Sequence, residues 1–402
     1  MKNNQKNKKI IILNVGSSSC KFQIFQDDFS PIGQALIDRI GLPGTNILYK
    51  GTNGKVIKKE HQLIFKHLVD YIVKFLTEEE IVNFADVYLM VHRVVNGANV
   101  FTKDIIIDSD EKLEKLISLD PFAPLHNPYN SATLKIFYQT YPHITQAVVF
   151  DTTFHATIPE HNYMYAIPYE LYEKYQLRRY GAHGSSHGFI TGQMEKYLHK
   201  EQVNIINLHL GNGASACLIK DSKSLNTSMG FTPLAGLVMG TRTGDIDPAI
   251  AFHLINQLKM DPKEVDEIFN KKSGLKGIFG PSSDMRDVSK AAIAGNHRAI
   301  LAKELFANRI TDYLAMYLNE LPTVEAIIFT GGIGQNDFAT VREIISHFNL
   351  KSIKLIAEFS NKDEVNKIST ADSEIAVYIV PTNEELYMAK IGKKLFKEKN
   401  NG

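Results

Sequence analysis

Two stretches of this chain, IIILNVGSSSCKFQIF (residues 10–25) and IINLHLGNGASACLIK (residues 205–220), share one pattern. Each has a β-rich apolar run, a glycine, a few small polar residues and a second β-rich run, which predicts two strands joined by a tight turn. Small residues at such a turn also let backbone N–H groups face an anion. An ordinary hairpin would explain either stretch alone. Because the pattern occurs twice, with Gly16 and Gly211 195 residues apart, we interpret the chain as a duplicated fold with a phosphate site between its halves.

A second pair of similar strings supports the duplication. AVVFDT begins at Ala147 and AIIFTG at Ala326, 179 residues later, and we expect them to be equivalent strands. Apolar strands alternate with helical patterns in both halves, which predicts two α/β domains with mixed sheets. Asn53-Gly54 predicts a further hairpin. RRYGAHGSSHGF is expected to be a loop. The final helix is expected to begin at Thr382, which has capping-box spacing to Glu385.

Composition excludes several classes of protein. The chain has 402 residues, 44% of them apolar and 22% charged, with a net charge of +1, as in an ordinary globular protein. Neither a basic excess nor an apolar window of about 20 residues is present, so we expect no nucleic-acid partner and no membrane partner. No apolar region long enough for secretion follows the N-terminal MKNNQKNKK, and the cytoplasm is the expected location. Cys20 and Cys217 are expected to be buried thiols.

Nine further strings carry a resemblance to a known family. They are, in order, HRVVNG, PLHNPYN, FDTTFH, RRYGAHGSSH, HLGNGAS, TSMGFTPLAGLVMGTRTGDIDP, SSDMRD, FTGGIGQN and PTNEEL. From about residue 10 to residue 396 the chain resembles the acetate kinases. That resemblance implies two RNase H-like (actin-like ATPase) domains with an interdomain cleft. It assigns the acyl and metal site to residues 1–151, joined by a C-terminal helix, 385–402, and the nucleotide to residues 152–384.

The activity that the resemblance implies is reversible phosphoryl transfer from ATP to acetate, which gives ADP and acetyl phosphate. It also implies direct in-line transfer, Mg²⁺ as cofactor with Mn²⁺ as a substitute, and a homodimer. Phosphoryl transfer needs positive charge around the moving group and a divalent metal on the nucleotide oxygens. The chain has no G-x-x-x-x-G-K-[ST] string, so it is not a P-loop enzyme.

Three side chains are candidate catalytic residues. Asp151 ends the strand AVVFD, where side chains of open α/β sheets meet ligand. His183 lies among small residues in GAHGSSHG, and Arg242 in a glycine-rich loop can offer a guanidinium fork to phosphate oxygens. The resemblance implies that His183 and Arg242 stabilise the transition state. Because acetate is already ionised at pH 7, we expect Asp151 to position the metal or a neighbouring arginine rather than remove a proton.

The remaining site residues follow from the resemblance. For the acyl substrate they are Arg93, which would hold the carboxylate, with Val95, Leu125, Ala182 and Pro233. For the metal they are Asn14 and Glu384, although Glu384 could simply stabilise a helix N-terminus. For ATP they are Lys21, His209, Leu210, Gly211, Asn212, Gly213, Asp284, Met285, Arg286, Gly332, Ile333, Gly334, Gln335 and Asn336. Lys21 could instead be a solvated strand lysine. His187 is expected to be a buried structural histidine, and the role of His126 stays open.

The chain departs from the family at four places. It has Asn96-Gly97-Ala98 where the family usually has His-Gly-Gly, Ala182 where it has Phe, and Ala235 and Gln335 where it has Glu. Ala182 matters most, because the usual phenylalanine helps to form the wall of the acyl pocket. The sequence therefore leaves acetate and propionate preference open. Two alternatives follow: a propionate or butyrate kinase of the same family, and a non-catalytic nucleotide-dependent switch, which would not need Arg93, His183 and Arg242.

Overall fold

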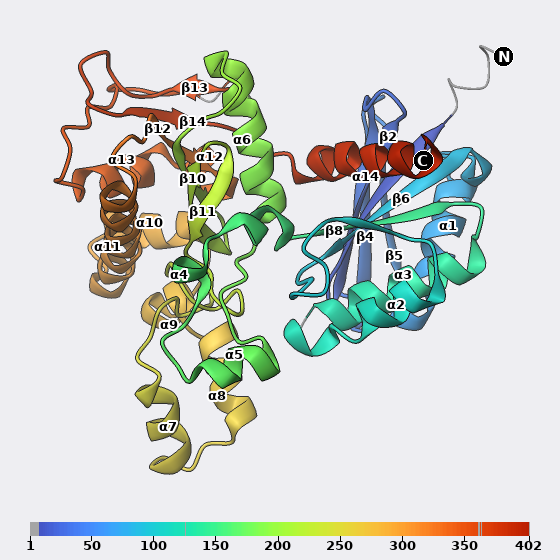
Figure 1. Cartoon of the computed structure of the whole chain (residues 1–402), viewed down its shortest axis with the longest axis horizontal. Helices are drawn as coiled ribbons and strands as arrows, with labels where there is room; N and C mark the ends of the chain where they lie inside the picture. The colour runs from blue at the N-terminus through green and yellow to red at the C-terminus, as the bar shows by residue number, and fades with distance from the viewer. Residues whose placement is uncertain (1–7, 125, 361, 363, 402) are drawn as a thin grey trace. The chain divides into compact units, whose positions relative to one another are not determined.

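The computed structural model describes residues 8–124, 126–360, 362 and 364–401. The chain divides into two compact units, unit 1 (Met1–Thr153 with Asn383–Gly402) and unit 2 (Phe154–Thr382), each with its own sheet (Figure 1). Glu384, which we expected in the second domain, lies in unit 1. The candidate substrate residue Leu125 lies outside the described residues.

Unit 1 is built on an eight-stranded sheet with the order β5-β4-β3-β2-β1-β6-β8-β7. The strands are β1 (Lys9–Val15), β2 (Ser19–Gln26), β3 (Pro31–Asp38), β4 (Thr45–Gly51), β5 (Val56–His61), β6 (Val87–Val94), β7 (Ile105–Ile107) and β8 (Thr145–Phe150). β1 pairs antiparallel with β2 and parallel with β6. The hairpins predicted at Gly16 and at Asn53-Gly54 are both confirmed.

Helices cover both faces of this sheet. They are α1 (Leu68–Glu78), α2 (Asp110–Ile117), α3 (Asn127–Thr140) and α14 (Glu384–Asn401), with short 3-10 turns η1 (Phe65–His67), η2 (Phe84–Asp86) and η3 (Asp120–Phe122). Successive residues of a strand point to opposite faces. Ile11 therefore packs with Phe137 of α3, whereas Ile12 packs with Met388 of α14. The α14 backbone lies so close that a Cβ at Gly392 would be 2.5 Å from Val91 Cγ2.

Unit 2 repeats the core of this architecture. Its six-stranded sheet has the order β11-β10-β9-β12-β14-β13. The strands are β9 (Ile205–Leu210), β10 (Ala214–Lys220), β11 (Lys223–Thr227), β12 (Ala326–Thr330), β13 (Asn366–Lys367) and β14 (Ala376–Ile379). This order matches β3-β2-β1-β6-β8-β7 of unit 1 strand for strand, and β9 is antiparallel to β10 and parallel to β12, as β1 is to β2 and β6. The predicted duplication is confirmed.

One predicted equivalence is wrong. AIIFTG forms β12, which lies next to β9 and therefore corresponds to β6, whereas AVVFDT forms β8, whose counterpart is β14. Both strings belong to central parallel strands, which are buried on both faces and read as similar apolar runs. Similarity between the two sequences therefore did not identify equivalent strands in the two sheets.

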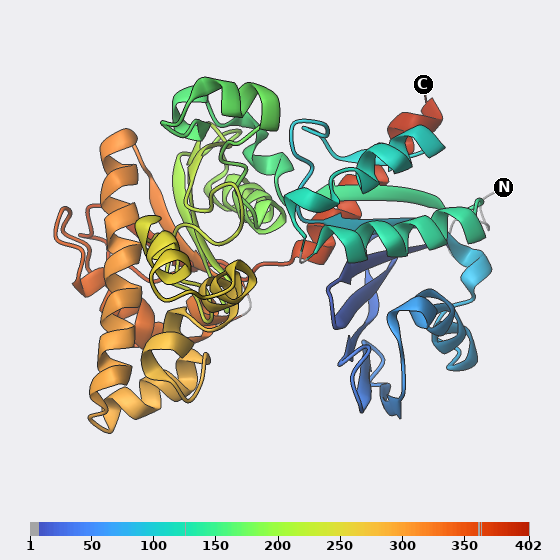
Figure 2. The ribbon, with the colours of Figure 1, turned by 90° about the horizontal axis from the view of Figure 1, so that it is seen from below.

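The helices of unit 2 are α4 (Glu160–Tyr163), α5 (Tyr169–Tyr175), α6 (Gly184–Leu198), α7 (Ala249–Asn256), α8 (Pro262–Lys271), α9 (Gly274–Phe279), α10 (Met285–Ile293), α11 (His297–Glu320), α12 (Gly331–Asn336) and α13 (Phe338–Ser346), and η4 (Thr153–Thr157) precedes them. α11 buries a stripe at helical spacing that includes Phe306, Ile310 and Leu314. Figure 2 shows this helix, in orange, along one side of unit 2.

The hairpin of β9 and β10 has one apolar face and one polar face. Ile206, Leu208 and Leu210 join the hydrophobic core that also contains α11 residues. On the other face, Asn207 lies opposite Cys217 in the register, and His209 lies opposite Ser215. All four are buried. Because buried polar groups require hydrogen-bond partners, this face must be covered by a polar surface, which α6 supplies.

Two local predictions are corrected. The segment GAHGSSHG is not a loop throughout, because α6 begins at Gly184 and buries Ser185, Ser186 and His187. The final helix does not begin at Thr382. α14 begins at Glu384, and Asn383 accepts a hydrogen bond from the Leu386 N–H at 2.9 Å, as an N-cap side chain does.

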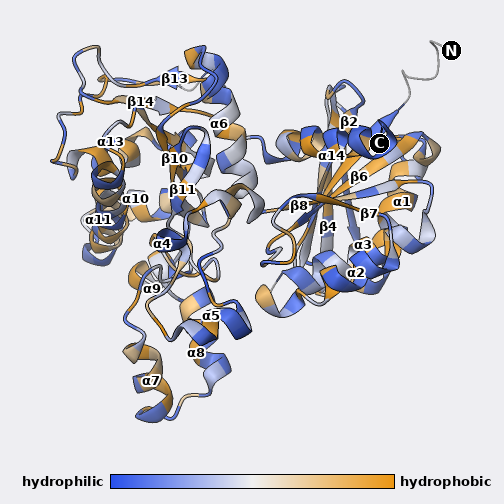
Figure 3. Cartoon of the chain, in the orientation of Figure 1, coloured by the Kyte–Doolittle hydropathy of each residue, from blue (hydrophilic) through white to orange (hydrophobic). Residues whose placement is uncertain are grey.

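Apolar side chains concentrate in the sheets, and Figure 3 shows β6 in the hydrophobic colour along most of its length. Cys20 and Cys217 are buried free thiols, as predicted, and burial raises the pKa of each to about 12. Among the described residues, no helix combines the length and apolar character needed to cross a membrane.

Candidate active site

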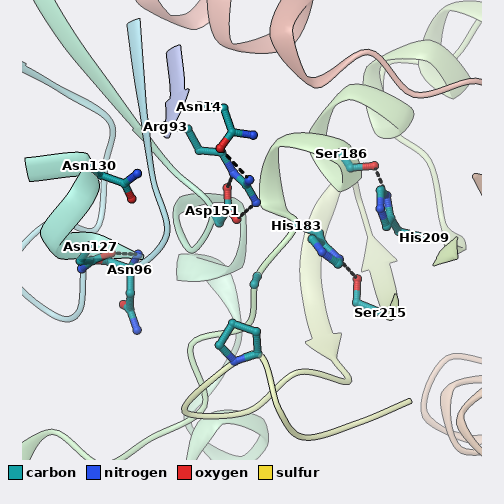
Figure 4. A network of polar contacts seen from close by, with 12 residues as sticks. Asn14, Arg93, Asn96, Asn127, Asn130, Asp151, His183, Ser186, His209 and Ser215 are labelled. Atoms are coloured by element: carbon teal, nitrogen blue, oxygen red, sulfur yellow. Dashed lines mark hydrogen bonds and ion pairs between the residues drawn. The ribbon is translucent and has the colours of Figure 1, made fainter. Parts of the chain in front are cut away.

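In unit 1, Arg93 and Asp151 form a bidentate ion pair. Arg93 Nε donates to Asp151 Oδ1 at 2.9 Å and Nη2 donates to Oδ2 at 2.6 Å. The third nitrogen, Nη1, donates to Asn14 Oδ1 at 3.2 Å, and Figure 4 shows the three side chains turned toward one another. β1, β6 and β8 are neighbouring parallel strands, so their carboxyl ends bring these residues to one edge of the sheet. Burial lowers the pKa of Arg93, but the charge of Asp151 outweighs it and the pKa is raised.

Glu384 lies at the start of α14 and interacts electrostatically with Arg93 and Asp151. The pKa of Glu384 is raised to about 7, chiefly by burial and also by Asp151 and Glu385, while Arg93 and Lys21 oppose the rise. Burial disfavours the charged form of the Glu384 carboxyl group, and a bound cation would stabilise that form. Asn14 also offers an amide oxygen, and Asp151 and Glu384 offer carboxylate oxygens, the ligand atoms that Mg²⁺ prefers. The residues present therefore fit a divalent cation, although the described residues contain no cluster of three His, Cys, Asp or Glu ligands.

Next to Arg93, the departure Asn96-Gly97-Ala98 forms a buried turn. Asn96 Oδ1 accepts from the Ala98 N–H at 2.8 Å, and Asn127 Nδ2 donates to the Asn96 carbonyl at 3.0 Å (Figure 4). Ala98 has φ +48°, in the left-handed region that glycine adopts freely. Val95 is buried. The Asn96 side chain therefore closes this turn with a hydrogen bond, and Ala98 adopts a glycine-like conformation within it.

In unit 2, His183 and Arg242 converge on the turn between β9 and β10. A Cβ placed on Gly213 would lie 3.3 Å from His183 Nε2 and 3.7 Å from Arg242 Nη1. Arg242 Nη1 also donates to the Pro233 carbonyl at 3.3 Å, so this candidate acyl residue lies beside the arginine. Ala182 is 2% exposed within the hydrophobic core of the unit, and its carbonyl is 2.9 Å from His155 Nε2.

His183 has an unusual backbone for a non-glycine residue. It caps α6 with φ +57° and ψ +24°. A left-handed conformation costs an L-residue roughly 1–2 kcal/mol, so the surrounding contacts must hold it. One of them joins His183 Nδ1 to Ser215 Oγ at 3.0 Å, and the ring lies 4.4 Å from that of His209, centroid to centroid. His209 Nδ1 is 2.8 Å from Ser186 Oγ (Figure 4).

Eight of the candidate ATP residues line one pocket of about 550 Å³ in unit 2, a size typical of small-molecule sites. They are Gly211, Asn212, Asp284, Met285, Arg286, Gly332, Ile333 and Asn336. Ser283 and Asp337 line it too and were not predicted. Arg286 and Asp284 form an ion pair with Nη2–Oδ2 at 2.6 Å at the mouth, and hydrogen bonds from Arg286 lower the pKa of Asp284 to about 2.

The other candidate ATP residues do not line this pocket. Leu210 and Gly334 are buried, so a ligand could meet only their backbone. Gly211 closes its turn by donating its N–H to the Gly213 carbonyl at 3.0 Å, as Gly16 does to Ser19 at 2.7 Å, so neither glycine N–H is turned to an anion. Lys21 lies on β2 of unit 1, and its ammonium is ion-paired with Glu385.

Gln335, which stands where the family usually has Glu, accepts two backbone hydrogen bonds. With its amide oriented to satisfy its neighbours, Oε1 accepts from the Thr382 N–H at 2.9 Å and from the Gly331 N–H at 3.2 Å. Gly331 has φ +79°, and a Cβ there would lie 2.7 Å from the Leu210 carbonyl oxygen. Gln335 therefore accepts from two backbone donors, one at the start of α12 and one in the segment after β14.

The polar residues that support His183 and His209 were not predicted from the sequence. Ser186, Asn207 and Ser215 are all buried and hydrogen-bonded to histidines, and His187, predicted to be a buried structural histidine, is one of them. For Asn207 and Ser215, which lie on strands, the signal was alternation: N-L-H-L and A-S-A-C place polar residues between apolar ones. Such alternation in a strand buried on both faces marks a buried polar layer.

Comparison with known proteins shows the family to which this chain belongs. Residues 9–390 match the acetokinase family. The chain is 43% identical to the acetate kinase of Clostridium novyi (strain NT), over 98% of this chain and 99% of that protein. Among solved structures, a propionate kinase from Francisella tularensis is similar with a TM-score of 0.91 at 36% identity, covering 96% of this chain and 100% of that one. Porphyromonas gingivalis acetate kinase has a TM-score of 0.88 at 33% identity, covering 97% and 100%. The chain belongs to the acetokinase family.

Proposed function

We propose that this protein is an acetate kinase, an ATP:acetate phosphotransferase that reversibly forms acetyl phosphate and ADP by direct in-line transfer. The match of residues 9–390 to the acetokinase family carries the proposal, because it covers every described residue of both clusters. A non-catalytic nucleotide switch would not need the positive and polar groups that surround Gly213.

In this proposal unit 1 handles the acceptor. Arg93 binds the acetate carboxylate, and Asp151 positions the Arg93 guanidinium through the two bonds of 2.9 and 2.6 Å. A guanidinium held at two nitrogens loses little freedom when it binds substrate. Asp151 takes no proton from acetate, which is ionised at neutral pH. Its role is to orient Arg93 and to supply negative charge near the metal.

Unit 2 handles the donor. The pocket lined by Asp284 and Gly332 takes the nucleoside part of ATP, and the turn at Gly213 takes the phosphates. His183 and Arg242, both beside Gly213, donate to the oxygens of the transferring phosphoryl group. Donors already in place as charge develops lower the barrier without reorganisation. The acetate oxygen forms a bond to phosphorus as the bond to the ADP oxygen breaks.

We further propose Mg²⁺ as the metal, with Mn²⁺ as a substitute, held by Asn14 and Glu384. When bound, the metal neutralises charge on the nucleotide oxygens. A homodimer and a cytoplasmic location are also proposed, on the family resemblance. Phe252 of α7 and Ile293 of α10, exposed by 64% and 89%, are apolar surface that a second copy could cover. Sedimentation velocity would measure the mass, and a concentration-independent monomer would refute the dimer.

Trapping acyl phosphate with hydroxylamine tests the main proposal. Protein, ATP, Mg²⁺ and acetate should give acetyl hydroxamate, and Arg242→Ala should give far less at the same nucleotide occupancy. An exposed arginine elsewhere is a matched control, and Arg309→Ala on α11 should leave the yield unchanged because it contacts only Asp312 among the ion pairs described. ATP binding without hydroxamate from any short-chain acid would favour the switch.

Propionate is a second candidate substrate, on two observations. Ala182 stands where the family has the phenylalanine of the acyl pocket, and the protein is similar to a propionate kinase of known structure. One methylene in an apolar pocket is worth about 1–3 kcal/mol, or roughly 10–200-fold in specificity. We expect appreciable kcat/KM for propionate, and Ala182→Phe should shift preference toward acetate. If native protein and variant discriminate equally among acetate, propionate and butyrate, residue 182 does not set the pocket size.

A further inference from the structure

Three buried polar side chains, Asn207, His187 and Ser215, form a chain of hydrogen bonds that ends at His183. Asn207 Nδ2 lies 2.8 Å from His187 Nδ1, His187 Nε2 lies 2.8 Å from Ser215 Oγ, and Ser215 Oγ lies 3.0 Å from His183 Nδ1. Figure 4 shows the last of these contacts. Asn207 and Ser215 come from the polar face of the β9–β10 hairpin, and both histidines come from the start of α6.

Every hydrogen bond in this chain is donated in the same direction, from Asn207 toward His183. An amide nitrogen can only donate, so His187 Nδ1 accepts from Asn207 and the hydrogen of a neutral His187 sits on Nε2. That Nε2–H donates to Ser215 Oγ, which leaves the Ser215 hydroxyl hydrogen to be donated to His183 Nδ1. A neutral imidazole carries a single hydrogen, so His183 carries its own on Nε2, the nitrogen beside Gly213.

Burial keeps the middle of the chain uncharged. His187 is fully buried, and burial, followed by the nearby His155 and His209, places the pKa of His187 well below its ordinary value. A second hydrogen on His183 is disfavoured as well. Its Nδ1–H would point at a Ser215 oxygen that already accepts from His187, and the serine hydrogen would lose its acceptor. The chain therefore favours one neutral tautomer of His183.

We propose that Asn207, His187 and Ser215 are positioning residues that hold His183 as a neutral imidazole with its hydrogen on Nε2, so that it donates to an oxygen of the transferring phosphoryl group. This inference rests on the proposed function. No proton moves along the chain during the reaction, since each bond only fixes the direction of the next. The consequence is a donor that does not depend on protonation of His183.

The orientation of the Asn207 side-chain amide sets the direction of donation along the whole chain. Asn207 Oδ1 is buried and has no hydrogen-bond partner among the described residues, so the amide meets His187 through Nδ2 alone. An oxygen in place of Nδ2 would accept from His187 Nδ1–H, and every bond after it would reverse. His183 Nε2 would then be a bare acceptor facing phosphate oxygens. Asn207→Asp imposes this reversal with almost no change in side-chain volume.

The kinetic test uses Asn207→Asp in the full chain. We expect kcat at pH 8 to fall about 100-fold, as when one preorganised donor is lost, with KM for ATP within about threefold. Activity should recover as pH falls, because a protonated His183 regains a donor at Nε2. The native protein should show no such recovery. A merely structural defect would lower activity at every pH, whereas native kcat and a native pH profile in Asn207→Asp would overturn the proposal.

Serine variants supply the matched controls. Ser215→Ala breaks the chain and should lower kcat, and Ser215→Thr, which keeps the hydroxyl, should restore most of it. Ser224→Ala is the control, because Ser224 is also a buried serine, 2.8 Å from a histidine nitrogen, but its partner is His155, outside the chain. It should leave kcat unchanged. If Ser215→Ala and Ser224→Ala behave alike, Ser215 does not act through His183.

A spectroscopic measurement separates this inference from the proposed function. ¹⁵N chemical shifts of His183 in the native full-length protein, assigned with His183→Gln, report which ring nitrogen carries hydrogen. We expect the Nε2–H form in the native protein and the Nδ1–H form in Asn207→Asp. An Nδ1–H or doubly protonated His183 in the native protein at pH 8 overturns the inference even if Asn207→Asp fails to fold. The expected tautomer without any acyl phosphate formation would refute only the proposed function.

Discussion

Adding a single methyl group at Gly213 should strongly impair catalysis, because this glycine lies beside both His183 and Arg242. A Cβ there would lie 3.3 Å from His183 Nε2, 3.4 Å from His183 Cε1 and 3.7 Å from Arg242 Nη1. The first two distances are tighter than ordinary van der Waals contact, so the imidazole must move by a few tenths of an ångström. The methyl group would also occupy the space in which a phosphate oxygen is proposed to meet both donors.

The expected effect of Gly213→Ala is on kcat rather than on folding. Gly213 does not require a positive φ, and the neighbouring groups are side-chain ends that can shift, so we expect a change in the free energy of unfolding within about 1 kcal/mol. Loss of one preorganised donor costs roughly 10²–10³-fold in kcat. Displacing His183 and crowding Arg242 should therefore lower kcat by at least about 100-fold.

The measurement combines initial rates of acyl phosphate formation with urea unfolding of the same samples. Gly192→Ala is the matched control, because a Cβ at Gly192 on α6 meets nothing within 4 Å and should leave kcat unchanged. Replacing a helical glycine by alanine should even stabilise the control, by up to about 1 kcal/mol. If Gly213→Ala keeps kcat within threefold of native at unchanged stability, the donors do not act in the space above Gly213.

Three other substitutions give separate tests. Arg242→Ala should lower kcat by about 10³-fold or more with little change in ATP affinity, since its guanidinium acts mainly on the transition state, and a raised KM for acetate at native kcat would contradict this role. Glu384→Ala should raise the Mg²⁺ concentration needed for half-maximal rate by at least about tenfold, whereas a lower Tm at unchanged Mg²⁺ dependence would mean that Glu384 serves only the N-terminus of α14. Burial raises the pKa of Asp104 to about 6 despite its bond from the Phe150 N–H, so the charged form destabilises the fold above pH 6, by roughly 2–3 kcal/mol. Asp104→Asn should therefore be more stable than native in urea at pH 8 and lose this advantage toward pH 4, and equal stability at pH 8 would show that Asp104 is better solvated than its surroundings indicate.

Local signals predicted the local structure well. The hairpins at Gly16, Gly211 and Asn53-Gly54 were predicted because glycine turns and apolar runs act over a few residues. Neighbours in the sheet depend on contacts distant in sequence, and for this reason AIIFTG was matched to the wrong strand. The helix from Gly184 was missed because glycine and serine have lower helix propensities than alanine or leucine. Tertiary burial of Ser185, Ser186 and His187 outweighs that propensity.

In the candidate site, too, individual residues were predictable from the sequence, but their partners were not. The family resemblance indicated Arg93, while a strand end and a run of small residues also pointed to Asp151 and His183, and the structure brings Arg93 and Asp151 into contact. What the sequence could not supply was the set of partners that orient them. Ser215 and His183 are 32 residues apart, and only the register of β10 against β9, with α6 packed on that face, makes them neighbours. Roles of the individual site residues stay predictions until the variants are measured.

The position of α14 imposes an order on biosynthesis. Met388 and Ala389 close the face of the unit 1 sheet that carries Ile10 and Leu89, yet the ribosome makes them after all of unit 2. At ~5–20 residues per second, roughly 10–50 s pass between the emergence of β8 and that of α14. For that time the nascent chain carries an uncovered apolar face on a sheet that is otherwise complete. The half of the enzyme that is translated first is thus the last to become a finished domain.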